Sequence, residues 1–413
     1  MKQDRFFYGY RVVLAGFLAN ALSSGIGFYG FSVFNKPIGD EFHWSRSSVA
    51  AGFLIYSVGV AAFSPVAGRL TDRHGPRRIL FLGTVILSAS LILLSRVSAI
   101  WNFYLLHLLL GTAITLIGAI PVSVNISNWF HRMRGTMQGI ALGGMGFGGL
   151  VLAPLLGNYL IPNLTWRGAY LALALLAPAV MLPLLFLVVR DHPHEKNLLA
   201  YGEEIAPKSG NQSHKAKQVT GLSLRETLRV PAFWIIVATA FVYGMSITGA
   251  LQNQVSILSL KGFPAAEAVV AIGVIGLFSG AGKFLFGYLC DRIEPKYAAA
   301  ISYALVGSAL VALTQGTSTA YIWLYAMLMG LGQGGWAPNL AMLAANYFGL
   351  RNFGTVLGAM HLVFYVGEAI GPWLAGLVYD RTGGYLPVLM AFLILCFASV
   401  PVIALARRPS RHG

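Results

Sequence analysis

The stretch Gly68-Arg-Leu-Thr-Asp72-Arg73-His-Gly75-Pro-Arg77-Arg78 places one aspartate, four arginines and two glycines between two apolar runs. The first run lies near 47–68 and the second near 77–95. Each has about the 20 apolar residues that a helix needs to cross a bilayer. A short polar turn between two such runs is typical of a membrane hairpin. This stretch therefore predicts two membrane helices joined by a tight, positively charged loop.

The rest of the chain repeats this pattern. Only 10% of the 413 residues are charged, against roughly 25% in soluble domains. We expect an all-α membrane protein of twelve spans in two pseudo-symmetric six-helix bundles. The predicted spans lie near 11–34, 47–68, 77–95, 101–128, 134–158, 166–189, 232–259, 266–288, 296–315, 320–347, 353–378 and 384–407.

An internal repeat links the two halves, because matching motifs recur at one constant spacing. Gly287-Tyr-Leu-Cys-Asp291-Arg292 closes the eighth span as Gly68 to Arg73 closes the second. At the same spacing, Gly135-Thr136 opens the fifth span and Gly354-Thr355 opens the eleventh. Duplicated halves of this kind rock around a central site in alternating-access transporters.

The distribution of basic residues predicts the orientation. With both termini in the cytoplasm, the inner segments hold 22 Lys and Arg residues and the outer loops hold six. The net charge of +15 therefore fits a multi-pass plasma membrane protein, such as a bacterial inner-membrane protein, better than a nucleic-acid binder. We divide the chain into a bundle at 1–189, a solvated cytoplasmic linker at 190–229 and a second bundle at 230–413. The expected partners are lipid, substrate and protons, and we expect a functional monomer.

At residues 68–78 the chain resembles the signature loop of the major facilitator superfamily. The resemblance implies a gating and structural cluster in which Asp and Arg form an inter-helix charge network. The residues concerned are Gly68, Asp72, Arg73, Gly75, Arg77 and Arg78, with Asp291 and Arg292 in the repeat. A loop that is merely positive on the inside would need neither the aspartate nor the paired glycines.

Two further stretches resemble the monocarboxylate transporter family, to which bacterial oxalate/formate exchangers are related. They are Asp4-Arg-Phe-Phe-Tyr8-Gly9-Tyr10 and the segment from Trp129 to Gly149. Animal members of that family carry a lysine in the first span and an Asp…Arg pair in the eighth. By position, Tyr29 stands for the lysine, and Ser279 with Lys283 stands for the pair. The cation is kept in altered form, while the carboxylate has left that helix.

Lys283 is the one clear cation inside a predicted span. Ionisable residues at membrane depth are costly and are functional candidates by default. Three small residues precede Lys283 and leave room beside its ammonium for a carboxylate. The alternative is a structural lysine that snorkels toward the cytoplasmic headgroups, because Asp291 lies only roughly 12 Å further along the helix.

His361, Tyr365 and Glu368 share one face of the eleventh span, at spacings i, i+4 and i+7. Counted from Arg351, His361 lies roughly 15 Å deep and Glu368 roughly 25 Å deep. We therefore expect Lys283 and His361 to hold the anion, with Glu368 or Lys283 carrying a proton. A satisfied structural carboxylate is the alternative for Glu368. For His107 in the fourth span, we expect a core histidine bonded to a backbone carbonyl.

The leading hypothesis is proton-coupled symport of a small organic monocarboxylate. Substrate-binding candidates are Lys283, His361, Tyr365, Tyr29, Ser279, Asn125 and Gln333. An oxalate/formate-type anion exchanger is the alternative, followed by a metabolite or drug exporter. A membrane sensor would need an output domain, and an enzyme would need a nucleophile, a phosphate loop or a metal-ligand spacing. We find no motif for a cofactor or a metal.

Overall fold

The computed structural model describes residues 7–203, 221–316 and 318–409. The N-terminal segment 1–6, which includes Asp4 of the family-like stretch, lies outside the described residues, as does the middle part of the predicted linker (204–220). The described part of the chain is built from helices, together with two isolated strand-like pairings. This confirms the predicted all-α class.

The first bundle contains six spans, several of them made of more than one helical segment. Its elements are α1 (Gly9–Ser24), η1 (Gly25–Tyr29), α2 (Gly30–Phe42), α3 (Arg46–His74), α4 (Pro76–Leu94), α5 (Ile100–Ile117), α6 (Ala119–Trp129), α7 (Arg134–Leu155), η2 (Leu156–Leu160), α8 (Ile161–Pro183) and η3 (Leu184–Val188). The chain reverses at Thr165, whose φ of 62° is non-helical and divides the apolar stretch Arg134–Val188 into two spans.

The second bundle repeats this plan. Its elements are α10 (Pro231–Leu260), α11 (Ala265–Arg292), α12 (Pro295–Gln315), α13 (Thr319–Gly334), α14 (Trp336–Phe348), α15 (Phe353–Thr382) and α16 (Leu386–Ala404). The short elements η4 (Pro193–Lys196) and α9 (Leu224–Thr227) lie between the bundles in sequence. Because α13 and α14 form one span, this bundle also has six. The predicted spans therefore agree with the structure, although the helical run that begins with α1 continues to Phe42 and α3 continues to His74, past the predicted ends at 34 and 68.

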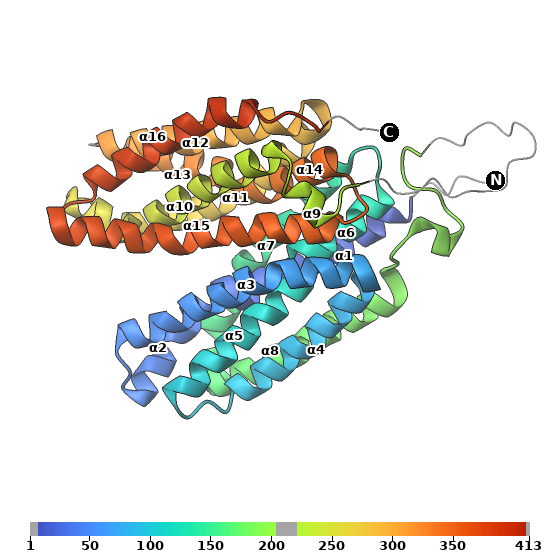
Figure 1. Ribbon diagram of the computed structural model, residues 1–413. Helices are drawn as coiled ribbons and strands as arrows, with labels where there is room; N and C mark the ends of the chain where they lie inside the picture. Colours follow the sequence, from blue (N-terminus) through green and yellow to red (C-terminus); the bar gives the residue numbers. More distant parts are fainter. Residues whose placement is uncertain (1–6, 204–220, 317, 410–413) are drawn as a thin grey trace, which may run out of the picture.

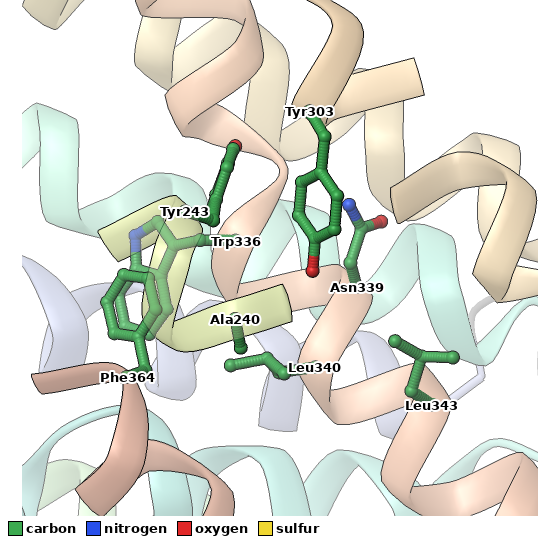
Figure 2. Close-up of a pocket in the computed structure, with 8 residues that line it drawn as sticks. All are labelled: Ala240, Tyr243, Tyr303, Trp336, Asn339, Leu340, Leu343 and Phe364. Carbon is green, nitrogen blue, oxygen red and sulfur yellow. The ribbon is translucent and has the colours of Figure 1, made fainter. Parts of the chain in front are cut away.

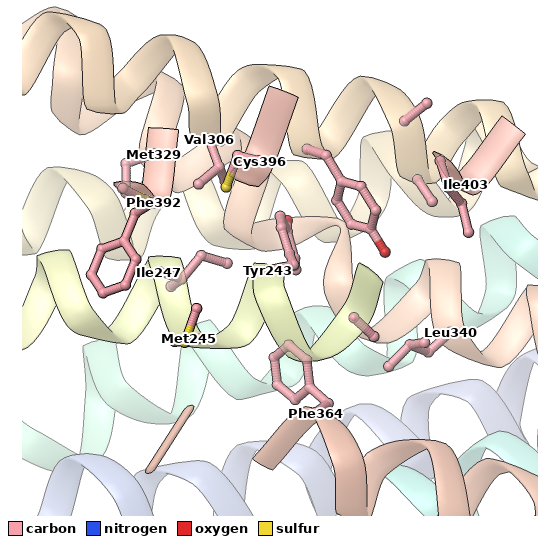
Figure 3. Packing of buried hydrophobic residues seen from close by; sticks show 14 of the residues in the cluster. Tyr243, Met245, Ile247, Val306, Met329, Leu340, Phe364, Phe392, Cys396 and Ile403 are labelled. Atoms are coloured by element: carbon pink, nitrogen blue, oxygen red, sulfur yellow. The ribbon is translucent and has the colours of Figure 1, made fainter. Parts of the chain in front are cut away.

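Each bundle has its own apolar core. In the second bundle, Tyr243 and Ile247 of α10 pack with Val306 of α12, Met329 of α13 and Phe392 of α16 (Figure 3). A separate cluster fills the first bundle. Because lipid is as apolar as these side chains, van der Waals packing rather than exclusion of water holds the helices of each core together.

The two bundles meet mainly along two helix pairs, α3 with α15 and α7 with α11. They come together at the end that carries both termini, and they diverge toward the other end (Figure 1). We call these the terminal end and the far end. At the terminal end the backbones touch, since a Cβ on Gly68 would collide with the carbonyl of Gly354, and one on Gly135 with that of Gly287. Toward the far end, a Cβ on Gly143 of α7 would meet nothing within 4 Å.

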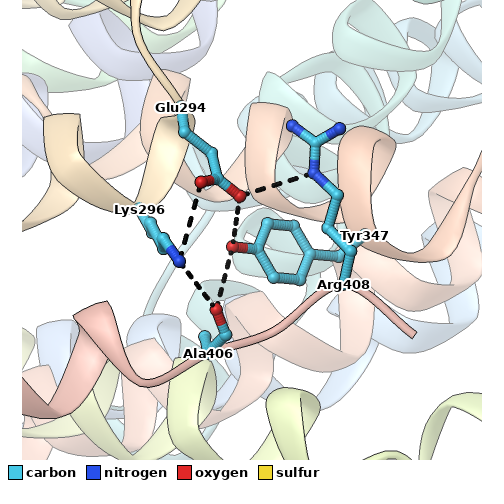
Figure 4. A network of polar contacts seen from close by, with 5 residues as sticks. All are labelled: Glu294, Lys296, Tyr347, Ala406 and Arg408. Atoms are coloured by element: carbon cyan, nitrogen blue, oxygen red, sulfur yellow. Dashed lines mark hydrogen bonds and ion pairs between the residues drawn. The ribbon is translucent and has the colours of Figure 1, made fainter. Parts of the chain in front are cut away.

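The C-terminal segment is tied to the terminal end of the second bundle. Glu294, between α11 and α12, accepts a hydrogen bond from the Tyr347 hydroxyl at 3.1 Å and pairs with Arg408 at 3.4 Å (Figure 4). Lys296 lies 3.6 Å from the same carboxylate and donates to the carbonyl of Ala406 at 3.2 Å. These contacts fix the last described residues beside the start of α12.

Candidate substrate site and gate

Lys283 is buried in α11, with 5% of its surface exposed. Its ammonium donates to the Ser279 hydroxyl at 2.9 Å, one turn toward the far end. No carboxylate pairs with it among the described residues. The side chain therefore points away from the headgroups that a snorkelling lysine would seek at the terminal end. At the same residue, α11 crosses α7 closely, because a Cβ on Gly139 would collide with the Lys283 carbonyl.

α13 and α14 connect Lys283 to the face of α15 that carries His361. Gly334 packs against the Ser279 carbonyl. Two residues on, the ring of Trp336 lies 5.4 Å from that of His361 and 5.9 Å from that of Tyr365. The buried Nε2 of His361 and Oε1 of Gln333 have no hydrogen-bond partner among the described residues. Buried polar atoms are nearly always satisfied, so these two mark a place where a polar ligand or water would bind.

The repeat gives the relative depth of Lys283 and His361. Gly139 contacts Lys283, and its counterpart in the second half, Gly358, contacts Ser64 of α3 in the same manner. Lys283 is therefore level with Gly358, and His361 lies about 4.5 Å further toward the far end. Because the Lys283 side chain also extends toward the far end, its ammonium approaches the depth of His361.

Tyr29 contributes to this region from the first bundle. It ends the π-helical turn Gly25–Tyr29, a distortion often found at functional sites. Its ring lies against Gly149 of α7, where a Cβ would be 2.6 Å from the ring carbons. One turn earlier on α7, the Cβ position of Gly146 is 3.5 Å from Gly280, the neighbour of Ser279. Helices of both bundles thus border the site.

Glu368 lies one turn beyond Tyr365, against α10. Its Cγ would be 3.2 Å from a Cβ on Gly244, while its backbone carbonyl accepts the Thr248 hydroxyl at 2.7 Å. No described residue forms a hydrogen bond or ion pair with its carboxylate oxygens.

Two other polar candidates lie elsewhere. Asn125 is buried in α6 with its Oδ1 unpartnered among the described residues, and its neighbour Val124 reaches the start of α15 at Gly354. This places Asn125 at the level of the terminal end rather than with His361. His107 has its Nδ1 2.8 Å from the carbonyl of Phe103, which confirms the expected core histidine.

Two aspartates join the bundles at the terminal end. Asp72, in the last turn of α3, accepts hydrogen bonds from the backbone N–H groups of Gly354 and Thr355, at 2.8 and 2.7 Å, and from the Thr355 hydroxyl at 2.6 Å. Asp291, in the last turn of α11, accepts the equivalent bonds from Gly135 and Thr136 of α7. Each carboxylate thus caps the first turn of a helix in the opposite bundle, where N–H groups lack helical partners.

The charge network implied by the family resemblance differs from this arrangement. No ion pair to Asp72 exists among the described residues, and the side chains of Arg73, Arg78 and Arg292 are exposed. Arg77 turns toward its own bundle, where its Nε donates to the Leu185 carbonyl at 2.7 Å. The aspartates bind helix N-termini instead of arginines because the close approach at Gly354 and Gly135 brings free N–H groups within reach.

The loop after α3 is completed by Gly75 and Asp191. Gly75 has a φ of 84°, which favours glycine. The Asp191 carboxylate accepts the N–H of Arg77 at 2.7 Å. Burial raises the pKa of Asp191, and the hydrogen bond from Arg77 opposes that rise. This pair fixes the start of α4.

A small cavity of about 10 Å³ lies inside the second bundle, behind the Trp336 ring (Figure 2). Trp336 stacks on Phe364 with ring centroids 4.6 Å apart and forms one wall. Tyr243, Tyr303 and Asn339 line the other side. The volume holds about one water molecule, so this cavity is too small for a carboxylate substrate.

Comparison with known proteins agrees with this architecture. The sequence pattern of the Major Facilitator Superfamily matches residues 17–372 and 276–413. The chain belongs to the major facilitator superfamily. It is 24% identical over 396 residues to monocarboxylate transporter 13 of Rattus norvegicus, covering 92% of this chain and 84% of that protein. It is 24% identical over 290 residues to the oxalate:formate antiporter of Oxalobacter formigenes, covering 70% and 64%.

The fold of this major facilitator is also found in a solved structure, that of the human organic anion transporter MFSD10. The TM-score is 0.70 with 18% identity, over 96% of this chain and 99% of that one. As a superfamily member with these relatives, the chain is a transporter.

Two breaks in the helices of this major facilitator carry a sequence signal for the site that the sequence analysis did not use. Gly118-x-x-Pro121 separates α5 from α6, and Gly335-x-x-Pro338 separates α13 from α14. The two motifs fall at almost the same place in their respective halves. Paired interruptions at corresponding positions of two halves are a known pointer to transporter binding sites. They would have placed Trp336 among the central residues.

Proposed function

We propose that this transporter carries small organic monocarboxylates together with protons, by alternating access. The observation that supports the proposal is Lys283, a buried ammonium whose hydrogen-bond partner among the described residues is the neutral Ser279 hydroxyl. Burying an unpaired cation is costly. A carboxylate that entered beside Ser279 would supply the missing charge and form a strong charge-assisted hydrogen bond.

The remaining site residues have distinct roles in this proposal. His361, Gln333 and Tyr365 complete the anion site from the second bundle, and Tyr29 borders it from the first. Asn125, nearer the terminal end, contacts the substrate on its way into the cytoplasm. Glu368 takes up and releases the coupled proton, with Lys283 as the alternative carrier, because neither group has an oppositely charged partner among the described residues.

The proposal also assigns an orientation and a division of labour. Both termini lie in the cytoplasm, so the closed terminal end faces inward and the protein is poised to receive substrate from outside. Residues 1–189 and 230–413 move as two bundles joined by the linker at 190–229. Gly68, Asp72, Arg73, Gly75, Arg77 and Arg78, with Asp291 and Arg292, form the inner gate. A monomer in a plasma membrane, in bacteria the inner one, suffices for this cycle.

Uptake into proteoliposomes tests the proposal. Radiolabelled lactate, pyruvate and acetate are offered with and without an inwardly directed proton gradient. We expect gradient-stimulated uptake of at least one substrate, and at least about a tenfold loss in Lys283→Ala, since hydrogen bonds to charged groups contribute about 1.5–3 kcal/mol. Lys261→Ala is the matched control, because Lys261 follows the end of α10 and binds the backbone carbonyls of Thr314 and Gly316 at the end of α12. Uptake of none of these acids, or uptake indifferent to Lys283→Ala, contradicts the assignment.

An oxalate/formate-type exchanger is the second candidate, favoured by the Oxalobacter relative. A dicarboxylate suits two cationic groups, whereas Lys283 is the one lysine or arginine buried in the described spans near the central residues. Counterflow of oxalate against formate, without any response to a proton gradient, would favour this candidate. Export of a cationic metabolite or drug is a third, and Lys283 opposes it by charge repulsion.

A further inference from the structure

The N-terminal part of the linker packs against the terminal end of the first bundle. The N–H of Tyr201 donates to the Trp129 carbonyl at 2.8 Å, and the Tyr201 carbonyl accepts the N–H groups of His131 and Arg132, both at 3.0 Å. Tyr201 thereby pairs with Phe130 as a one-residue parallel strand. Its ring also lies 5.9 Å from that of Phe130. We call this set of contacts the first clasp.

The C-terminal part of the linker packs against the terminal end of the second bundle. The N–H of Leu222 donates to the Phe348 carbonyl at 2.8 Å, and its carbonyl accepts the side-chain amide of Asn352 at 3.1 Å. Gly221 pairs with Gly349 as a one-residue antiparallel strand. We call these contacts the second clasp.

The two clasps use equivalent positions of the repeat. Trp129 and Phe348 accept the same kind of bond at the same length, and they are separated by the same spacing as Asp72 and Asp291. The glycines beside the clasps also match: a Cβ on Gly202 would collide with Arg132, and a Cβ on Gly221 would be 2.7 Å from the backbone nitrogen of Arg351. Gly202 has a φ of 84°, so a side chain there would be strained as well.

Each clasp lies just before a gate contact. The first clasp holds His131 and Arg132, and three residues later Gly135 and Thr136 donate to Asp291. The second clasp holds the loop from Phe348 to Asn352, which is followed by Gly354 and Thr355, the donors to Asp72. A loop that is fixed beforehand loses less conformational entropy when its next residues bind.

We propose that the two ends of the linker act as clasps that preorganise the first turns of α7 and α15 for Asp291 and Asp72, and thereby favour closure of the terminal end. The linker then works through its docked ends and not through its length. This inference goes beyond the proposed function and does not depend on which substrate is carried.

A simple tether makes a different prediction. The stretch from Glu203 to Thr220 can reach at most about 60 Å when extended. If the linker only tethered the bundles, its length would matter and the residues at its docked ends would not. Variants that break a clasp and variants that lengthen the linker therefore distinguish a clasp from a simple tether.

Pulsed electron paramagnetic resonance on the full chain measures closure of the terminal end. Spin labels are attached at His74→Cys and Ile293→Cys, exposed positions in opposite bundles, after Cys290 and Cys396 are replaced by alanine. Gly202→Val breaks the first clasp, and Leu222→Pro removes the donor of the second. Tyr201→Pro provides a second way to break the first clasp if Gly202→Val does not fold. The control variant carries a short added run of Gly and Ser after Ser209.

We expect each clasp variant to raise the ratio of long to short inter-label distances by about three- to tenfold, the range for losing one hydrogen bond. The lengthened control should match the parent. Combined with Asp291→Asn, Gly202→Val should add little, whereas combined with Asp72→Asn its effect should persist. Distances unchanged in both clasp variants, or changed as strongly by the lengthened linker, would overturn the proposal.

Discussion

Asp291 and Thr136 are joined twice, since the same carboxylate oxygen accepts the backbone N–H and the hydroxyl of Thr136, each at 2.6 Å. The two residues belong to α11 and α7, on opposite sides of the boundary between the bundles. Asp72 and Thr355 repeat the arrangement on the other side of the pseudo-twofold axis. A negative charge at a helix N-terminus is favourable, so opening the terminal end requires both carboxylates to give up charge-assisted bonds.

Asp291→Asn and Asp72→Asn should each loosen the terminal end. An asparagine keeps the size but loses the charge, and its NH₂ group faces a donor. Cys290 offers a native probe, because it is buried, its Cβ lies beside Gly135 and its thiol donates to the Asn339 side chain at 3.3 Å. In a Cys396→Ala background, we expect maleimide to react with Cys290 about tenfold faster in each variant, consistent with about 1.5–3 kcal/mol for such bonds. Asp380→Asn, at an exposed site on α15, controls for charge. Unchanged labelling in both gate variants would show that these bonds do not hold the end closed.

Glycines on α7 should differ sharply in their tolerance of a side chain. Gly135→Ala would drive a methyl group into the Gly287 carbonyl, whereas Gly143→Ala would place one in open space. We expect Gly135→Ala to destabilise the closed protein by about 1–3 kcal/mol, as overpacking does, and to reduce transport. Gly143→Ala should leave the thermal midpoint and the transport rate near the parent values. Equal effects of the two substitutions would mean that the α7–α11 contact does not limit closure.

The sequence predicted the spans and the repeat well, because apolar length and the constant spacing of matched motifs are read directly from the chain. It could not predict what Asp72 binds. A carboxylate near arginines suggests ion pairs, and only the close approach of α3 to α15 at Gly354 favours backbone donors. The direction of the Lys283 side chain also required the structure, since Ser279 and the terminal headgroups are both within its reach. The clasp at Tyr201 has no sequence pattern, because its bonds involve backbone atoms.

Glu368→Gln should uncouple transport from protons. A glutamine cannot release a proton, so net uptake should no longer respond to an imposed proton gradient, while exchange of labelled for unlabelled carboxylate should continue. Both are measured in proteoliposomes, with Glu294→Gln as a carboxylate control at the terminal end. If Glu368→Gln keeps the full response to the gradient, Lys283 becomes the candidate proton carrier.

Protonation of Glu41 at low pH should make the first bundle less stable. Hydrogen bonds from Arg167 and Trp166 hold the pKa of Glu41 below its usual value, near the far end of α2. A lowered pKa means that the stabilisation is complete above the unfolded value, about 4.3, and is lost as pH falls through the folded value. Since the Glu41 side chain is 43% exposed, we expect at most about 1 kcal/mol.

Thermal unfolding of the parent and of Glu41→Gln, between about pH 3 and pH 7, measures this contribution. The difference in midpoint should be largest at neutral pH and should shrink toward acid. A difference that stayed constant over this range would attribute the effect of the substitution to packing and not to charge.

Lys283 and Asp291 stand on the same uninterrupted helix, two turns apart, and this gives α11 the properties of a lever. A rigid rod transmits displacement along its length without any chain of rearranging side chains. If, as proposed, an anion binds at Lys283 and draws it toward the first bundle, Asp291 would shift with it against the beginning of α7. The tilt of α11 would then differ between the empty and the loaded protein.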